Sequence, residues 1–131
     1  MVPVRFLLVD DSEDIRELFV RVARGRSDVA CAGVLTSADH LAEEAARSSP
    51  DIVIVDLALP GREPTDAIRE LRTCMPGCKI LVYTGREDDA ATQAALDAGA
   101  TCVLGKSLTV LELLERAKSI VTSTFIKSPY P

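Results

Sequence analysis

The sequence lacks any apolar run that approaches the roughly 20 consecutive residues a helix needs to cross a lipid bilayer. Its first residues, Met1 to Arg5, run directly into a strand-like pattern and lack the features of a signal peptide. The net charge is −5, which leaves no broad basic field to hold a nucleic acid backbone. We therefore expect a cytoplasmic protein that enters no membrane and makes no direct contact with DNA or RNA.

The four cysteines and the single histidine form no CxxC redox motif, and none of them lies near the acidic strand ends. Cys31 and Cys102 fall inside expected strands, where a reduced cysteine behaves as a small apolar residue. Cys74 and Cys78 are separated by a turn containing proline and glycine rather than by the spacing of a CxxC motif. We expect these thiols to be free, because disulfides are rare in cytosolic proteins. The single histidine, His40, falls on an expected helix and should be solvated.

The length and composition indicate one compact domain. A chain of 131 residues with 47% hydrophobic residues is long enough to bury one core. We assign residues 1–126 to this domain and residues 127–131, which include two prolines, to a flexible tail. The sequence contains no internal repeat, low-complexity segment or linker.

Apolar runs alternate with helical periodicities and predict five strand–helix units. The strands are expected at Arg5–Asp10, Val29–Leu35, Ile52–Val55, Lys79–Tyr83 and Thr101–Leu104, and the helices between Ser12 and Gly25, between Leu41 and Ser48, around Ala67 to Leu71, at Asp89–Ala98 and at Leu108–Val121. The third strand is β-branched and apolar on both faces, which suits the centre of a covered parallel sheet. We expect an α/β fold with a doubly wound five-stranded parallel sheet, flavodoxin-like with strand order 2-1-3-4-5, and helices on both faces.

Polar side chains come directly at the ends of four of these strands. Asp10 and Asp11 end the first strand, and Asp56 follows the third. Thr84 follows the fourth strand and Lys106 follows the fifth. Because the carboxyl ends of parallel strands lie along one edge of the sheet, these side chains should meet there.

Three clustered carboxylates repel one another, so the site should hold a cation, and an all-oxygen ligand set favours Mg²⁺ over Zn²⁺. Asp11 or Ser12 can also cap the first helix, a role that is compatible with metal binding nearby. A metal-shielded Asp56 can attack an activated phosphoryl group. Mg²⁺, Lys106 and the Thr84 hydroxyl would then take up charge on the phosphoryl oxygens. The predicted product is an aspartyl phosphate.

With these residues the chain resembles the receiver domain of bacterial two-component response regulators, the CheY-like family, over nearly its whole length. The family carries an acidic pair, a phosphoacceptor aspartate, a hydroxyl residue and a lysine, matched here by Asp10 and Asp11, Asp56, Thr84 and Lys106. The segment Asp56-Leu57-Ala58-Leu59-Pro60 also matches, and so does Ala98-Gly99-Ala100.

The resemblance implies that Asp56 accepts a phosphoryl group from a histidine kinase or a phosphotransfer protein in a Mg²⁺-dependent phosphorelay. The implied metal ligands are Asp10, Asp11, Asp56 and the main-chain carbonyl of Ala58. Thr84 and Lys106 would sense the phosphate. In the family, the face made of the fourth helix, fifth strand and fifth helix carries the signal to partners or to a second receiver, as in a homodimer. Such a receiver is not an enzyme beyond its own phosphoryl transfer and slow autodephosphorylation.

Three residues depart from the family pattern. Ser107 follows Lys106 where the family usually has a proline, often after a cis peptide bond. Val103 stands where an aromatic switch residue is expected, and Pro64 stands in place of a usual glycine in the loop after the phosphoacceptor. Val103 and Ser107 motivate a second hypothesis, a receiver-like scaffold that binds its partner whether or not Asp56 is modified.

Two enzyme classes are rejected. Gly105-Lys106-Ser107 is similar to the end of a phosphate-binding P-loop, but five residues separate Gly99 from Gly105 where that motif has four. A phosphatase of the haloacid dehalogenase type would need a second acid two residues after Asp56, and that position is Ala58. An enzyme acting on a small phosphorylated substrate has little support, since no second general base can be identified.

Overall fold

The structure is a computed structural model that describes residues 2–85 and 88–123. The tail expected at residues 127–131, and the last residues assigned to the domain, lie outside the described residues. The elements are β1 (Val4–Val9), α1 (Glu13–Arg24), β2 (Val29–Leu35), α2 (Leu41–Ser48), β3 (Ile52–Asp56), α3 (Pro64–Cys74), β4 (Lys79–Thr84), α4 (Asp89–Ala98), β5 (Cys102–Gly105) and α5 (Val110–Thr122). The strands form one parallel sheet in the order β2-β1-β3-β4-β5, which confirms the predicted flavodoxin-like fold.

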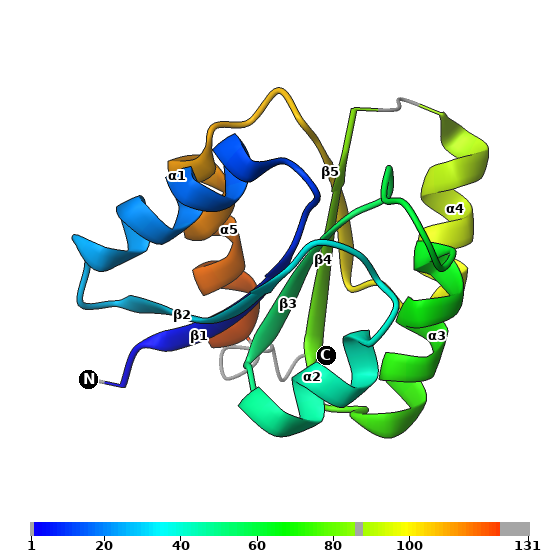
Figure 1. The fold of residues 1–131 in the computed structure, drawn as a ribbon, viewed down its shortest axis with the longest axis horizontal. Helices are drawn as coiled ribbons and strands as arrows, with labels where there is room; N and C mark the ends of the chain where they lie inside the picture. The colour runs from blue at the N-terminus through cyan, green and yellow to red at the C-terminus, as the bar shows by residue number, and fades with distance from the viewer. Residues whose placement is uncertain (1, 86–87, 124–131) are drawn as a thin grey trace, which may run out of the picture.

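The sheet lies between two layers of helices. Helices α1 and α5 cover one face, and α2, α3 and α4 cover the other (Figure 1). The central strand β3 contributes side chains to the hydrophobic cores on both faces of the sheet, because successive side chains of a strand point to opposite faces. Val53 and Val55 pack in the core beneath α2 and α3, whereas Ile52 and Ile54 pack in the core beneath α1 and α5. This arrangement places the carboxyl ends of the strands together at one edge.

Helices α1, α4 and α5 begin after a side chain that accepts a hydrogen bond from the first turn of the helix. Ser12 accepts from the N–H of Ile15 at 3.3 Å and starts α1. Helix α5 begins at Val110 rather than at Leu108 as expected, because Thr109 and Glu112 form a capping box. The start expected at Leu108 was therefore wrong by two residues. A threonine three residues before a glutamate is the sequence pattern that indicates a capping box, and here it marks the observed start.

Pro64 does not lie in the loop after β3, where the sequence analysis placed it. It is the first residue of α3 and is buried. A proline suits this position, because its fixed φ is helical and its missing N–H has no partner in the first turn. The left-handed residue of the loop is Gly61, with φ of 81°, where an added Cβ would lie 2.6 Å from Oδ1 of Asp39. The glycine makes the turn, and the proline starts the helix.

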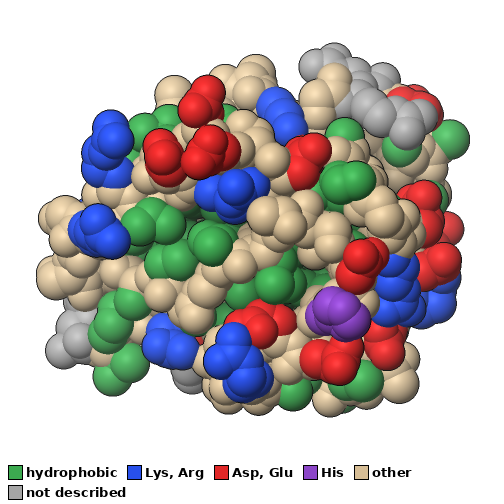
Figure 2. Space-filling view, in the orientation of Figure 1, with side chains coloured by type: hydrophobic (Ala, Val, Ile, Leu, Met, Phe, Trp, Pro, Cys, Tyr) green, Lys and Arg blue, Asp and Glu red, His purple; other side chains and the backbone are tan. Residues whose placement is uncertain are grey.

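No helix in the described part of the chain combines the length and the apolar character that a membrane crossing requires. Cys31, Cys74, Cys78 and Cys102 are free thiols, as expected. On the face shown in Figure 2, acidic and basic side chains are interspersed and do not form one broad field of either sign.

Candidate functional site

Acidic side chains from β1 and β3 meet at the carboxyl edge of the sheet. The two strands pair with Val9 opposite Val55, so the residues that follow, Asp10 and Asp56, are neighbours. Asp10, Asp11 and Asp56 each offer a carboxylate oxygen, and these oxygens lie within 4.8 Å of one another. Asp10 is 0% and Asp56 is 2% exposed, whereas Asp11 is exposed. The expected cluster of carboxylates is therefore present.

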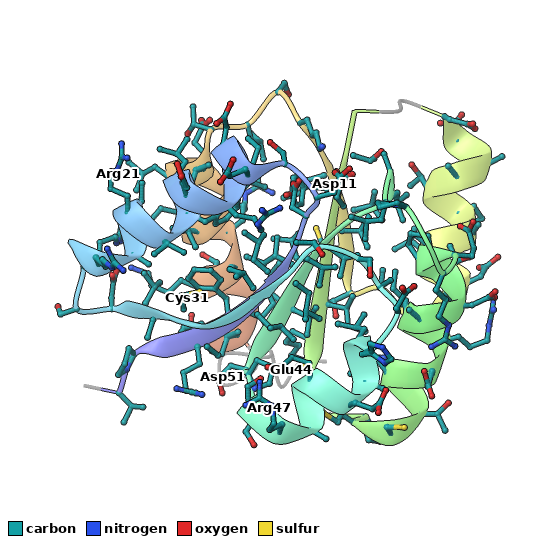
Figure 3. All side chains as sticks on the ribbon, in the orientation of Figure 1. Asp11, Arg21, Cys31, Glu44, Arg47 and Asp51 are labelled. Atoms are coloured by element: carbon teal, nitrogen blue, oxygen red, sulfur yellow. The ribbon has the colours of Figure 1, made fainter. Side chains whose placement is uncertain are left out.

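Figure 3 labels Asp11, the exposed residue of this cluster, and so shows where the cluster lies. Asp11 lies at the edge where the strands end, and Asp51 lies at the opposite end of the sheet. There Asp51 accepts the backbone N–H of Arg5 at 2.9 Å. An aspartate at the start of β3 thus has a structural partner and no access to the acidic cluster.

Both carboxylate oxygens of Asp56 accept hydrogen bonds. The Lys106 ammonium donates to Oδ2 at 2.7 Å, and the N–H of Ala58 donates to Oδ1 at 2.9 Å. Ion pairs of this kind make short, strong hydrogen bonds, and Asp56 is almost fully buried while Lys106 is partly exposed. The lysine side chain therefore bridges solvent and the buried carboxylate.

Thr84 is the last residue of β4 and is buried at the same edge. Its carbonyl accepts the N–H of Lys106 at 2.9 Å, so the backbone ties the residue after β5 to the end of β4. Because Tyr83 pairs with Asp56 across the sheet, Thr84 lies one residue beyond that pair. All the residues predicted to act together lie at one edge of the sheet. They are Asp10, Asp11, Asp56, Thr84 and Lys106.

Tyr83 also belongs to this group, although the sequence analysis counted it only as a strand residue. Its hydroxyl donates to Oδ2 of Asp10, and the Lys106 ammonium lies 5.1 Å from the centre of its ring. Burial, reinforced by the hydrogen bond to Asp10, raises the pKa of the Tyr83 phenol. The phenol stays protonated and acts as a donor. The available signal was a polar-tipped aromatic residue next to Thr84 at a strand end.

The departures from the family pattern occupy defined places. Lys106 contacts Asp56 although the residue that follows the lysine is Ser107 and not a proline. The described residues contain no cis peptide bond. Val103 is partly buried and packs against the core beneath α2, α3 and α4. The lysine thus reaches the carboxylate without a following proline, while the β5 position has an aliphatic side chain in place of a ring.

The donor set suits a hard divalent cation. All three side chains that can share an ion are carboxylates, and two of them are buried. Within residues 2–85 and 88–123 this is the one group of three acidic, histidine or cysteine side chains close enough to do so. Oxygen ligands of this kind match the preference of Mg²⁺, and no sulfur or imidazole ligand is among them.

Comparison with known proteins agrees with this geometry. A family model described as the response regulator receiver domain matches residues 6–118. The chain is 38% identical over 124 residues to the transcriptional regulatory protein AruR of Pseudomonas aeruginosa, covering 92% of this chain and 50% of that protein. It spans about half the length of the first curated relatives it matches.

Solved structures share the same architecture. A two-component response regulator of the LuxR family from an Aurantimonas species superposes with a TM-score of 0.83 at 30% identity, covering 92% of this chain and 86% of that one. A CheY-like receiver domain protein from Methanospirillum hungatei has a TM-score of 0.84 at 21% identity, covering 96% and 99%, and shares the fold. The chain belongs to the response regulator receiver domain family and is a signalling domain of two-component systems.

Proposed function

We propose that this domain accepts a phosphoryl group on Asp56 from a histidine kinase or a phosphotransfer protein and thereby changes its contacts with partner proteins. The observation that carries the proposal is the surroundings of one buried carboxylate. Asp56 is paired with Lys106 at 2.7 Å and lies with Asp10 and Asp11 in a group whose oxygens are within 4.8 Å. Charge of both signs is thus concentrated where a phosphoryl group would arrive.

Asp10, Asp11, Asp56 and the main-chain carbonyl of Ala58 would hold Mg²⁺. When bound, the ion supplies positive charge that offsets the repulsion among the carboxylates and the charge on the phosphoryl oxygens. A carboxylate oxygen of Asp56 forms a bond to phosphorus while the bond from phosphorus to the imidazole nitrogen of the donor breaks. That nitrogen keeps the electron pair.

Lys106 and Thr84 would detect the product. Phosphorylation turns one carboxylate oxygen of Asp56 into the bridging oxygen of an acyl phosphate. The negative charge that Lys106 now faces is thereby lost from the carboxylate, and the ammonium turns to a phosphoryl oxygen. Thr84, buried next to the same edge, can donate its hydroxyl to another phosphoryl oxygen. These two movements are the local events that a two-state receiver needs. Beyond this transfer and slow loss of the phosphate, we propose no enzymatic activity.

The proposed partners are proteins, and the proposed compartment is the cytoplasm. The net charge of −5 opposes contact between this domain and a nucleic acid backbone. The face made of α4, β5 and α5 is the proposed docking surface for a partner or for a second copy of the chain.

A second candidate function rests on Val103. This partly buried position in β5 has no ring to move between buried and exposed states. The alternative function is therefore a scaffold whose partner binds regardless of phosphorylation. Partner affinity measured with and without beryllium fluoride, which mimics a phosphoryl group, separates the two. Equal affinities favour the scaffold, because a partner that binds both states equally well does not shift the equilibrium between them.

The direct test is incubation with acetyl phosphate and Mg²⁺, followed by intact mass measurement. We expect a single added phosphate in the native chain and in Asp51→Asn, which removes an aspartate at the far end of β3. We expect no addition in Asp56→Asn or when a chelator removes Mg²⁺. An unmodified native chain, or an adduct that survives Asp56→Asn, would rule the proposal out.

A further inference from the structure

Tyr83 contacts two of the charged groups around Asp56. Its hydroxyl donates to Oδ2 of Asp10, and its ring lies 5.1 Å from the Lys106 ammonium. Tyr83 is 2% exposed and packs in the core beneath α1 and α5, with its ring centre 6.3 Å from that of Phe19. The ring is therefore part of the hydrophobic core, while its hydroxyl reaches the acidic cluster.

Two donors on different oxygens fix the side chain of Asp10. The N–H of Ser12 donates to Oδ1 at 2.8 Å, and the Tyr83 hydroxyl donates to Oδ2. Asp10 is fully buried, so water cannot replace either donor without a rearrangement. With both bonds in place, the carboxylate cannot rotate, and its remaining lone pairs keep one direction.

We propose that Tyr83 is a positioning residue that holds Asp10 in the orientation in which it binds Mg²⁺. This inference rests on the proposed function, since it assigns a role toward the ion of the same site. A carboxylate oxygen can accept a hydrogen bond and bind a metal together, because it has two lone pairs. Partners that orient metal ligands commonly change metal affinity by about 10- to 100-fold when removed.

The hydroxyl is separable from the packing role of the ring. Leu81, two residues earlier on the same face of β4, fills its part of the core with an apolar side chain. The Tyr83 ring fills the next part, and a phenylalanine would do so equally well. What tyrosine adds is one donor, and its acceptor is a carboxylate of the acidic cluster.

The test compares Mg²⁺ affinity by isothermal titration calorimetry in the native chain, in Tyr83→Phe and in Phe19→Leu. Tyr83→Phe removes only the hydroxyl, and we expect its dissociation constant for Mg²⁺ to rise about tenfold. Phe19→Leu disturbs the same aromatic packing but leaves the hydroxyl on Asp10, and we expect an unchanged constant.

The outcomes separate the two proposals. Unchanged or tighter Mg²⁺ binding in Tyr83→Phe overturns the role of Tyr83, and so does equal weakening in both variants. Absence of Mg²⁺ binding by the native chain overturns the proposed function itself. If Tyr83→Phe is only marginally folded, the rise in Tm that Mg²⁺ produces is compared instead. The inference then requires a smaller rise in Tyr83→Phe than in Phe19→Leu, and equal rises overturn it.

Discussion

The ammonium of Lys106 donates to Oδ2 of Asp56 at 2.7 Å from a loop in which serine follows the lysine. The start of this loop is fixed by the sheet. Thr84 pairs with Gly105, and the next N–H, that of Lys106, donates to the Thr84 carbonyl at 2.9 Å. The position of the lysine therefore follows from strand register, and a proline after it is not needed for the contact.

Lys106→Met should slow phosphorylation of Asp56 without preventing it. The methionine keeps an apolar stem but removes the charge that faces the incoming phosphoryl oxygens. Loss of one such group commonly costs about 100-fold in rate. The measurement is the rate of phosphate incorporation from acetyl phosphate by intact mass. Lys79→Met, at the start of β4, is the matched control and should react at the native rate. Equal rates in both variants would contradict the role of Lys106.

Mg²⁺ should raise the melting temperature of the native chain. An ion that relieves repulsion among the three carboxylates stabilises the folded state, by about 2.7 kcal/mol at one hundred times its dissociation constant. Asp11→Asn should reduce this rise, because it removes one charge from the cluster at its exposed member and leaves the buried carboxylates in place. Thermal melts with and without Mg²⁺ measure it. A rise of the same size in the variant would count against Asp11 as a ligand.

Arg72→Ala should destabilise the fold by about 2–3 kcal/mol, since hydrogen bonds to a charged group each contribute more than neutral ones. One guanidinium donates to the carbonyls of Gly99, Pro76 and Cys78, which joins the end of α3 to two turns. Urea unfolding measures the change. Arg69→Ala removes a single exposed ion pair with Asp66 at 3.3 Å and should change stability by less than about 1 kcal/mol. Similar losses in both variants would show that the three carbonyls do not depend on Arg72.

Asp28 should contribute stability that is lost in acid. Its hydrogen bond to Arg26, with a further one to Lys118, holds the pKa of this carboxyl well below its usual range. A group whose pKa is lower in the folded state stabilises the fold above its unfolded pKa of about 4 and loses that contribution as pH falls further. The difference in unfolding free energy between the native chain and Asp28→Asn should therefore be constant from about pH 7 to about pH 5 and shrink below about pH 4. A difference that does not change with pH would contradict the pairing.

The sequence predicted those residues of the site that lie at the ends of strands. Asp56, Thr84 and Lys106 each come at the end of an apolar run, and parallel topology alone brings such ends to one edge. The common doubly wound order makes β1 and β3 neighbours, and their register in the structure places Asp10 beside Asp56. Apolar runs that each end at a polar residue therefore predicted most of the arrangement.

The residues that were missed depend on local or cross-sheet partners. Tyr83 fits an apolar strand pattern, and only the fold shows that its hydroxyl meets Asp10, 73 positions away. The start of α5 is set by the reciprocal bonds of Thr109 and Glu112, which override the helical spacing of Leu108. Pro64 was judged against a family position, whereas its fixed φ suits the first turn of a helix.

The last two residues of β4, Tyr83 and Thr84, project to opposite sides of the sheet. Both lie at the edge of the sheet where the acidic cluster is. Tyr83 extends into the layer of α1 and α5, and Val82 before it packs in the layer of α2, α3 and α4, the side that Thr84 shares by alternation. On the proposed function, we therefore expect a displacement of Asp10 to reach the layer of α1 and α5 through Tyr83 and the layer of α2, α3 and α4 through the neighbouring residues of the same strand. A partner docked on either layer would then sense the same event.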